Sequence, residues 1–373
     1  MAVSKNEKNN RRTKLLRRRI LVFCILAVLI CAIAFGAFAI VRSCRTSLSK
    51  QVMPFSTGSC YAFTGDGFLY ANDKKLNFLC LADEKKSFSS GLDSESVQVA
   101  GTEHIKVVYG ASSLQIIGTP YEHSYEGGIK KVACGGKYVG VYFENADNSH
   151  SLEVYNSAGD CIKKLALGSS VLLDFGFEGG NSSAMYTSEL VITGSAVSTT
   201  VTTFDLARDS VTGVMNISGE IAKNVFMTGK SIFVFATDHL IRYDRNSNSE
   251  AYRMLVRGYE CDDFLIYDGK AYLILSKNGE AYEPLRVMEI RESSSADEKV
   301  LELAKDTDAK AVFMMNGSVV AVKNDMVVIR DMNGSLTATL LHGMNAEAAE
   351  KLDGSRILLF EGNDAVLFTI KNF

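Results

Sequence analysis

Short runs of apolar residues follow one another along most of the chain from about residue 48. Many come in pairs joined by a glycine turn, as in 226–236, where one short run passes through Gly229 into the more apolar run Ile232-Phe233-Val234-Phe235. Short apolar runs bounded by turn residues are typical of β-strands, and few stretches show the 3.6-residue periodicity of an amphipathic helix. The pattern predicts an all-β chain after the N-terminal segment.

The pair of strands joined by a glycine turn recurs along the chain. Successive turn glycines are on average about 41 residues apart, a spacing typical of propeller blades. These glycines are Gly65, Gly101, Gly136, Gly180, Gly229, Gly269, Gly317 and Gly354. The second strand of most repeats is apolar at consecutive positions, which suits a strand buried between two neighbouring blades. We predict an eight-bladed β-propeller, with seven blades as the alternative if the irregular fourth repeat, 171–217, is not a blade.

The eighth repeat ends before its outermost strand, because the chain stops soon after the run 365–370. An open ring would leave a blade face and sheet edges bare. The run 48–53 is available to complete the last blade. We therefore expect a composite blade that joins the two ends of the propeller.

The N-terminus has the pattern of a membrane anchor. Residues 20–41 contain no charge and no proline, and as a helix they would span about 33 Å, enough for a hydrocarbon core of roughly 30 Å. Eight Lys or Arg side chains precede this run within residues 1–19, which places the N-terminus in the cytoplasm by the positive-inside rule. The alternative is a cleaved signal peptide, since Ala37-Phe38-Ala39 resembles a cleavage site.

These features give a domain plan. It consists of a basic cytoplasmic tail (1–19), a transmembrane signal anchor (20–41), a polar tether (42–50) and a propeller ectodomain (51–373). The expected location is the cell membrane, with a single pass and the propeller outside the cell. Residues 46–373 contain 30 basic and 42 acidic side chains. The ectodomain therefore lacks the excess of positive charge that is typical of nucleic-acid-binding proteins.

Motifs that would identify an enzyme or a metal site are missing from the sequence. The five histidines are scattered without paired spacing, and no nucleophile elbow, phosphate loop or nucleotide fingerprint occurs. The stretch 244–250 alternates oxygen ligands as a calcium loop would, but it lacks the glycine at position six and the distal glutamate, so we interpret it as a solvated hairpin. We expect a non-enzymatic protein without a cofactor or metal.

The ectodomain cysteines do not form a regular disulfide framework. They are five in number: Cys60, Cys80, Cys134, Cys161 and Cys261. Cys60 and Cys80 fall on the first and third strands of one predicted blade, about 9–10 Å apart, which is too far for a disulfide. An odd count at irregular spacing indicates buried free thiols.

Long loops indicate which face of the propeller binds a partner. The turns between second and third strands share a face with the blade-to-blade connections, and they are long at 145–150, 191–199 and 277–284. Functional residues tend to gather on long loops held by a rigid scaffold. The candidate binding residues on this face are Tyr259, Glu260, Asp262, Asp263 and Tyr282, and further acids lie near the connections at Glu220, Asp306 and Asp308.

The chain lacks the signatures of the common propeller subfamilies, because it has neither a Trp-Asp dipeptide nor any tryptophan, which argues against WD40 repeats. The order of a basic N-terminal tail, one membrane helix and a propeller with glycine turns resembles the architecture of an uncharacterised family of membrane-anchored bacterial propeller proteins. The architecture is also similar to the eight-bladed scaffold lipoprotein of the outer-membrane β-barrel assembly machinery, although the lipobox and docking tryptophans are missing. That analogy implies protein–protein scaffolding.

Three functions are compatible with the sequence. The first is a non-enzymatic scaffold that binds an envelope protein or peptide at the loop-rich face. The second is binding of carbohydrate or a cell-wall polymer through tyrosines and acids, for which Tyr121, Tyr125, Tyr259 and Tyr282 are available. The third is a lyase or hydrolase with its site in the central channel, which would require side chains converging from several blades.

Overall fold

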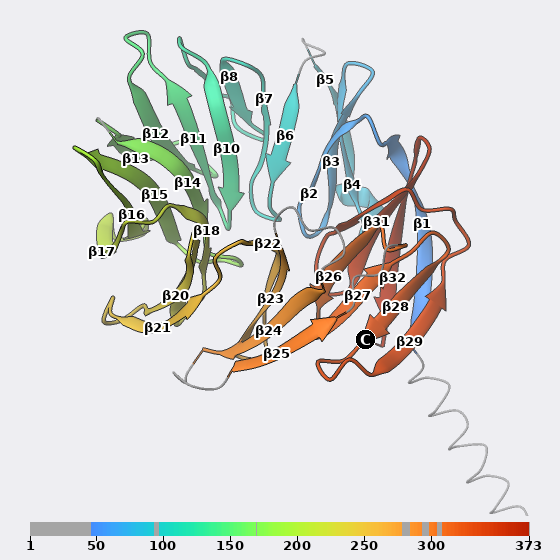
Figure 1. Cartoon of the computed structure of the whole chain (residues 1–373). Helices are drawn as coiled ribbons and strands as arrows, with labels where there is room; N and C mark the ends of the chain where they lie inside the picture. The colour runs from blue at the N-terminus through green and yellow to red at the C-terminus, as the bar shows by residue number, and fades with distance from the viewer. Residues whose placement is uncertain are drawn as a thin grey trace, which may run out of the picture. The chain divides into compact units, whose positions relative to one another are not determined.

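The computed structural model describes residues 46–92, 97–168, 170–277, 284–292, 298–303 and 308–372 (Figure 1). Residues 50–369 form one compact unit. Among the described residues, no helix is long and apolar enough to cross a membrane. The predicted cytoplasmic tail and signal anchor lie outside the described residues.

Residues 50–369 fold into an eight-bladed propeller of four-stranded antiparallel sheets. The first four blades are, in order, β2 (Cys60–Phe63), β3 (Gly67–Asn72), β4 (Lys75–Cys80) and β5 (Phe88–Gly91); β6 (Gln98–Gly101), β7 (Lys106–Tyr109), β8 (Ser113–Ile116) and β9 (Glu122–Ser124); β10 (Ile129–Gly135), β11 (Tyr138–Glu144), β12 (His150–Asn156) and β13 (Cys161–Ala166); β14 (Val171–Phe177), β15 (Ala184–Thr193), β16 (Ala196–Asp205) and β17 (Ser210–Ser218). A short 3-10 helix, η1 (Glu84–Lys86), precedes β5.

The remaining blades complete the ring. They are β18 (Ala222–Met227), β19 (Ser231–Ala236), β20 (His239–Asp244) and β21 (Glu250–Leu255); β22 (Tyr259–Tyr267), β23 (Lys270–Lys277), β24 (Leu285–Arg291) and β25 (Glu298–Leu303); β26 (Ala311–Met315), β27 (Ser318–Val322), β28 (Met326–Arg330) and β29 (Leu336–Leu341); and β30 (Ala348–Lys351), β31 (Arg356–Glu361) and β32 (Asp364–Lys371) with β1 (Ser47–Ser56). In Figure 1 first strands such as β6, β10 and β22 lie towards the middle, and fourth strands such as β13, β17 and β25 lie outside.

The second strands of the blades are the most deeply buried elements, as their sequences predict. Every residue of β19, the strand that follows the turn at Gly229, is buried. Each hydrophobic cluster joins neighbouring blades; for example, Phe233 and Phe235 of β19 pack with Leu273 and Leu275 of β23. The stabilisation of the ring is therefore spread over the contacts between blades, where apolar area is removed from water on both faces of each sheet.

The last blade is composite, which confirms both the eight-blade prediction and the role of residues 48–53. Its strand order is β30-β31-β32-β1, so the N-terminal strand supplies the outermost position. Blade eight is also held to blade one by Arg356, whose Nη2 donates to Gly65 O at 2.9 Å and whose guanidinium lies 4.6 Å from the centre of the Phe63 ring. The strand β1 begins at Ser47, within the stretch predicted as a tether.

The turn that leads from β30 to β31 holds Arg356 in place. Asp353 accepts hydrogen bonds from the backbone N–H groups of Ser355 and Arg356, both at 2.8 Å, and from Arg356 Nε at 2.6 Å. Burial acts to raise the pKa of Asp353, but these hydrogen bonds and the adjacent positive charge outweigh it, so the pKa is lowered overall.

One local prediction differs from the structure, and one turn is closed by a side chain. The fourth repeat is a regular blade with the longest central hairpin, β15–β16, so the predicted loop 191–199 is strand and a tight turn. Gly229 does not adopt a positive φ; instead the Thr228 hydroxyl accepts hydrogen bonds from the N–H groups of Lys230 and Ser231 and organises the turn. A threonine can close a turn by such a bond, which removes the need for a left-handed glycine.

The five described cysteines are free thiols, as predicted. Only Cys80 is fully buried, and Cys161 on the outer strand β13 is exposed, so the prediction that all are buried is wrong for Cys161. Burial raises the pKa of both Cys134 and Cys261 to about 12, which leaves these thiols protonated and unreactive at neutral pH.

Candidate functional site

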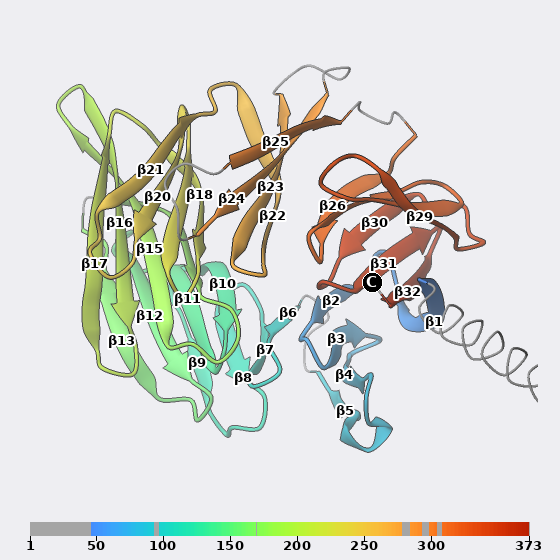
Figure 2. The ribbon, with the colours of Figure 1, turned by 90° about the horizontal axis from the view of Figure 1, so that it is seen from below.

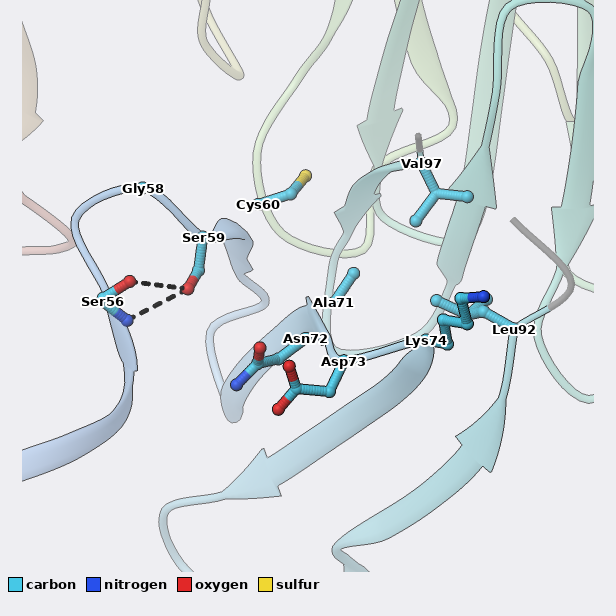
Figure 3. Close-up of a pocket in the computed structure, with 10 residues that line it drawn as sticks. All are labelled: Ser56, Gly58, Ser59, Cys60, Ala71, Asn72, Asp73, Lys74, Leu92 and Val97. Atoms are coloured by element: carbon cyan, nitrogen blue, oxygen red, sulfur yellow. Dashed lines mark hydrogen bonds between the residues drawn. The ribbon is translucent and has the colours of Figure 1, made fainter. Parts of the chain in front are cut away.

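Consecutive strands of a blade are antiparallel, so the turns alternate between the two faces of the ring. One face carries the turns between second and third strands together with the blade-to-blade connections, and we call it the recognition face. Over blade one this face contains a hollow of about 890 Å³ (Figure 3). Its lining residues are Ser56, Gly58, Ser59, Cys60, Ala71, Asn72, Asp73, Lys74, Leu92 and Val97.

One wall of the hollow is the connection from β1 to β2. Ser56 N–H donates to Ser59 Oγ at 3.0 Å, the two hydroxyl oxygens lie 3.2 Å apart, and Ser59 N–H donates to Ser56 O at 3.0 Å. Thr57 Oγ1 donates to Gly362 O at 3.1 Å and so ties the connection to the β31–β32 turn. The two serine hydroxyls are thus fixed on the wall that faces the blade-one turn in Figure 3.

The opposite wall is the two-residue turn between β3 and β4, formed by Asp73 and Lys74 with φ values of 49° and 58°. Such turns normally carry glycine, as at Asp268-Gly269 between β22 and β23, because a side chain in the left-handed region costs about 1–2 kcal/mol. Leu92 N–H donates to Lys74 O at 2.8 Å and holds the turn against the next connection. Among the described residues, Lys74 is the one with a positive φ that is neither glycine, asparagine nor aspartate, and it lies on the wall of the hollow.

The chemistry of the hollow is that of a polar binding surface. It offers two hydroxyls, an amide, a carboxylate and an ammonium group, and none of the described side chains that line it is aromatic. Its cysteine, Cys60, has a pKa raised by burial, so the thiol is a poor nucleophile. The sequence did not identify this site, because its walls come from three separate segments of the chain and each looks like an ordinary turn.

Four of the five candidate binding residues from the sequence, Tyr259, Glu260, Asp262 and Asp263, lie on the innermost strand of blade six, β22, and not on a loop. Glu260 forms an ion pair with Lys223 of β18 at 2.7 Å. Asp262 Oδ1 accepts a hydrogen bond from Ser276 Oγ at 2.9 Å. The Tyr259 ring lies 4.6 Å from the guanidinium of Arg286. Tyr282 lies outside the described residues.

The last of these four candidates, Asp263, joins three blades. Its Oδ2 accepts from Met314 N–H of β26 at 2.6 Å, and its Oδ1 accepts from Phe264 N–H at 2.9 Å and from Lys351 Nζ of β30. Lys351 Nζ also donates to Met314 O at 3.4 Å. Asp263 and Lys351 therefore provide hydrogen-bond partners for both the N–H and the C=O group of Met314, on the innermost strand of blade seven. We call Asp263, Lys351 and the Met314 backbone the inner clasp.

Glu220, which lies in the connection between β17 and β18, is buried and has several structural partners. It accepts hydrogen bonds from the N–H groups of Asp238 and His239, contacts the His239 ring at 2.7 Å, and pairs with Arg253 at 3.3 Å. These bonds fix the turn between β19 and β20 to the connection before blade five. Asp306 lies outside the described residues.

The tyrosines proposed for carbohydrate binding are not gathered in the described part of the chain. Tyr121 is 55% exposed but lies between β8 and β9, on the face opposite the recognition face. Tyr125 is buried, and its hydroxyl donates to Tyr155 Oη at 3.2 Å. Burial raises the pKa of Tyr125. These two rings do not form a stacking platform with Tyr259.

A metal centre is not evident either. The described residues contain no group of three or more His, Cys, Asp and Glu side chains placed to hold a metal ion. The stretch 244–250 is the hairpin turn between β20 and β21, as predicted, and Asp244 Oδ1 accepts from the N–H groups of Asn246 and Ser247.

Comparison with known proteins gives the fold and leaves the family open. No protein-family model matches the chain, and no curated protein matches it. Among solved structures, the WD40 domain of SCAP from fission yeast has a TM-score of 0.56 at 8% identity and covers 86% of this chain and 98% of its own. Sqt1 of Saccharomyces cerevisiae has a TM-score of 0.52 at 9% identity, covering 87% and 98%.

A eukaryotic initiation factor is similar at a TM-score of 0.55 and 11% identity, covering 86% of this chain and 90% of its own. At such low identity these similarities concern the fold alone. They also show that the missing Trp-Asp dipeptide, which argued against WD40 repeats, does not exclude the WD40 architecture. The chain has a WD40-like, eight-bladed β-propeller fold.

Proposed function

We propose that the protein is a non-enzymatic scaffold, anchored in the cell membrane by residues 20–41, that binds a protein or peptide partner outside the cytoplasm through its recognition face. The observation that carries the proposal is the polar hollow over blade one, whose wall keeps Lys74 in a left-handed conformation. WD40-type propellers are typically protein-binding scaffolds, which supports the choice of partner.

The charged residues near the ring axis favour binding over catalysis. The carboxylates of Glu260 and Asp263 on β22 are each paired with a lysine from another blade. Paired carboxylates with structural hydrogen bonds are poorly placed to act as a general acid and base. The hollow is lined by hydroxyl, amide and charged groups, which suits hydrogen bonding to a peptide.

The anchor part of the proposal rests on the sequence of residues 1–41 and on its similarity to membrane-anchored bacterial propellers. It is tested by fusing a reporter enzyme, active only outside the cytoplasm, to the C-terminus of the full chain. We expect an active reporter in the membrane fraction. An active reporter released into the medium would indicate a cleaved signal peptide, and an inactive one would refute the topology.

Partner binding is tested with the full chain purified from membranes after cross-linking in cells, with quantification of the proteins that accompany it. Lys74→Glu reverses the charge in the hollow, and the matched control Lys86→Glu reverses a charge in η1 of the same blade, on the opposite face. We expect Lys74→Glu to reduce the recovered partner about tenfold, which corresponds to about 1.4 kcal/mol, and Lys86→Glu to leave it unchanged.

Equal recovery with both variants would refute the hollow as the binding site. Recovery of no protein, together with binding to a glycan array, would replace the proposal with the carbohydrate alternative. The lining of the hollow includes no aromatic ring on which a sugar could stack, and this feature favours the protein partner.

A further inference from the structure

The outer strand of blade four, β17, is the longest fourth strand that has no charged residue; the other two uncharged ones, β5 and β29, have four and six residues. It has nine residues, SVTGVMNIS, with no charged residue and no proline. The only longer fourth strand, β1, carries Lys50 and Pro54, and the others have three to six residues. Charges and prolines are the usual devices that prevent a sheet edge from pairing with another chain.

The outer edge of β17 is open. The sheet order is β14-β15-β16-β17, and no strand of the described chain pairs with β17 on its other side; in Figure 2, β17 lies at the outer margin. The register aligns Val214 with Thr202, and Gly219 N–H donates to Val197 O at 2.8 Å. In an antiparallel pair the hydrogen-bonded positions alternate. The backbone N–H and C=O groups of Val214, Asn216 and Ser218 therefore point outward.

The side chains along this edge do not obstruct a further strand. The Val214 side chain is 52% exposed. Asn216 accepts a hydrogen bond from Thr200 Oγ1 at 2.9 Å, which holds its side chain over the blade. At the start of the strand Thr212 O already accepts from Asn248 Nδ2 at 3.0 Å, so the open segment begins after this residue.

We propose that β17 is a docking site for an extended, uncharged segment of a partner protein, which adds a fifth strand to blade four. The outward donors and acceptors at Val214, Asn216 and Ser218 specify an extended backbone, because only a strand matches their alternate spacing. The uncharged edge favours an uncharged partner segment. This site lies on the rim of the ring and does not depend on the hollow of blade one.

The probe is a synthetic peptide with the sequence of residues 198–204, STTVTTF, acetylated and amidated, which is the natural antiparallel neighbour of β17 on its inner side. The readout is residue-resolved amide hydrogen exchange of the full chain in detergent. We expect the peptide to slow exchange at Val214, Asn216 and Ser218 by about tenfold. Amides elsewhere in the ring should be unaffected.

The matched variants are Val214→Pro and Val214→Thr. Proline removes an N–H that points outward, so the bonds between β16 and β17 remain, and proline is tolerated on such edges. We expect Val214→Pro to abolish protection at Asn216 and Ser218, and Val214→Thr to retain it. A melting curve of each variant establishes that it is folded.

Two results would overturn the proposal. One is exchange that the peptide leaves unchanged in the folded wild-type chain. The other is a concentration-dependent increase in mass, measured by sedimentation, that Val214→Pro abolishes; a second copy would then be the occupant of the edge.

Discussion

The inner clasp makes the most specific prediction about the stability of the ring. Asp263 and Lys351 come from blades six and eight, and together they hold the N–H and C=O of Met314 on the strand between them. Their side chains are 11% and 19% exposed. Replacing Asp263 with alanine removes the acceptor for Met314 N–H and leaves the Lys351 ammonium without its carboxylate.

The cost follows from the number of bonds and from their burial. Removing one member of a buried, hydrogen-bonded ion pair costs about 3–5 kcal/mol. Because both side chains keep some contact with water, we expect Asp263→Ala to lower the free energy of unfolding by about 3 kcal/mol. Asp263→Asn keeps an oxygen for Met314 N–H and loses the negative charge, so its expected cost is about 1–2 kcal/mol.

Two measurements check this prediction, denaturant unfolding and hydrogen exchange at the Met314 amide. Exchange at Met314 should be at least about tenfold faster in Asp263→Ala. The control is Asp209→Asn, which alters an ion pair whose carboxylate is 71% exposed and should cost less than about 1 kcal/mol. If Asp263→Ala is no more destabilising than Asp209→Asn, and Met314 exchange is unchanged, the clasp does not stabilise the ring.

Three further predictions concern strain, thiol reactivity and pH. Lys74→Gly should raise the free energy of unfolding by about 0.5 kcal/mol, because relief of the left-handed strain exceeds the added freedom of the unfolded chain, and denaturant unfolding measures it. At pH 8, iodoacetamide should modify the exposed Cys161 first, as mass spectrometry would show. Cys134 and Cys261, whose pKa values are raised to about 12, should react only when the protein unfolds. Reaction of all three thiols at one rate would contradict this. Because the pKa of Asp353 is lowered in the folded state, its ionised carboxylate stabilises the fold at pH values above the unfolded pKa of about 3.9, and this stability is lost as the pH falls through the folded pKa. Asp353→Asn should therefore have a lower melting temperature than the wild type at pH 7. The two melting temperatures should converge near pH 2.

The repeated architecture could be predicted from the sequence because each blade has the same physical requirement. A strand packed between two neighbouring blades must be apolar on both faces, and β19 and β31 show this directly in consecutive apolar residues. The missing fourth strand of the last repeat, together with the spare run at 48–53, indicated the closure that the structure shows.

The hollow could not be predicted, because its walls come together only when the ring closes. Ser56 ends a strand of blade eight and Ser59 follows it, whereas Asp73 and Lys74 form a turn within blade one. One local signal was available: an Asp-Lys pair stands in a two-residue hairpin turn where glycine is usual. The candidate residues on β22 were misplaced for a related reason, since the strand begins at Tyr259 and its acids take structural partners.

The central claim is that the recognition face, through its hollow, binds a protein. The most direct measurement places a photo-cross-linking amino acid at Asn72, in the hollow, or at Lys86, on the opposite face of the same blade, in the full chain expressed in cells. We expect one dominant protein adduct from Asn72 and none of that mass from Lys86. Adducts of equal yield from both positions, or none from Asn72 in a folded chain, would contradict it.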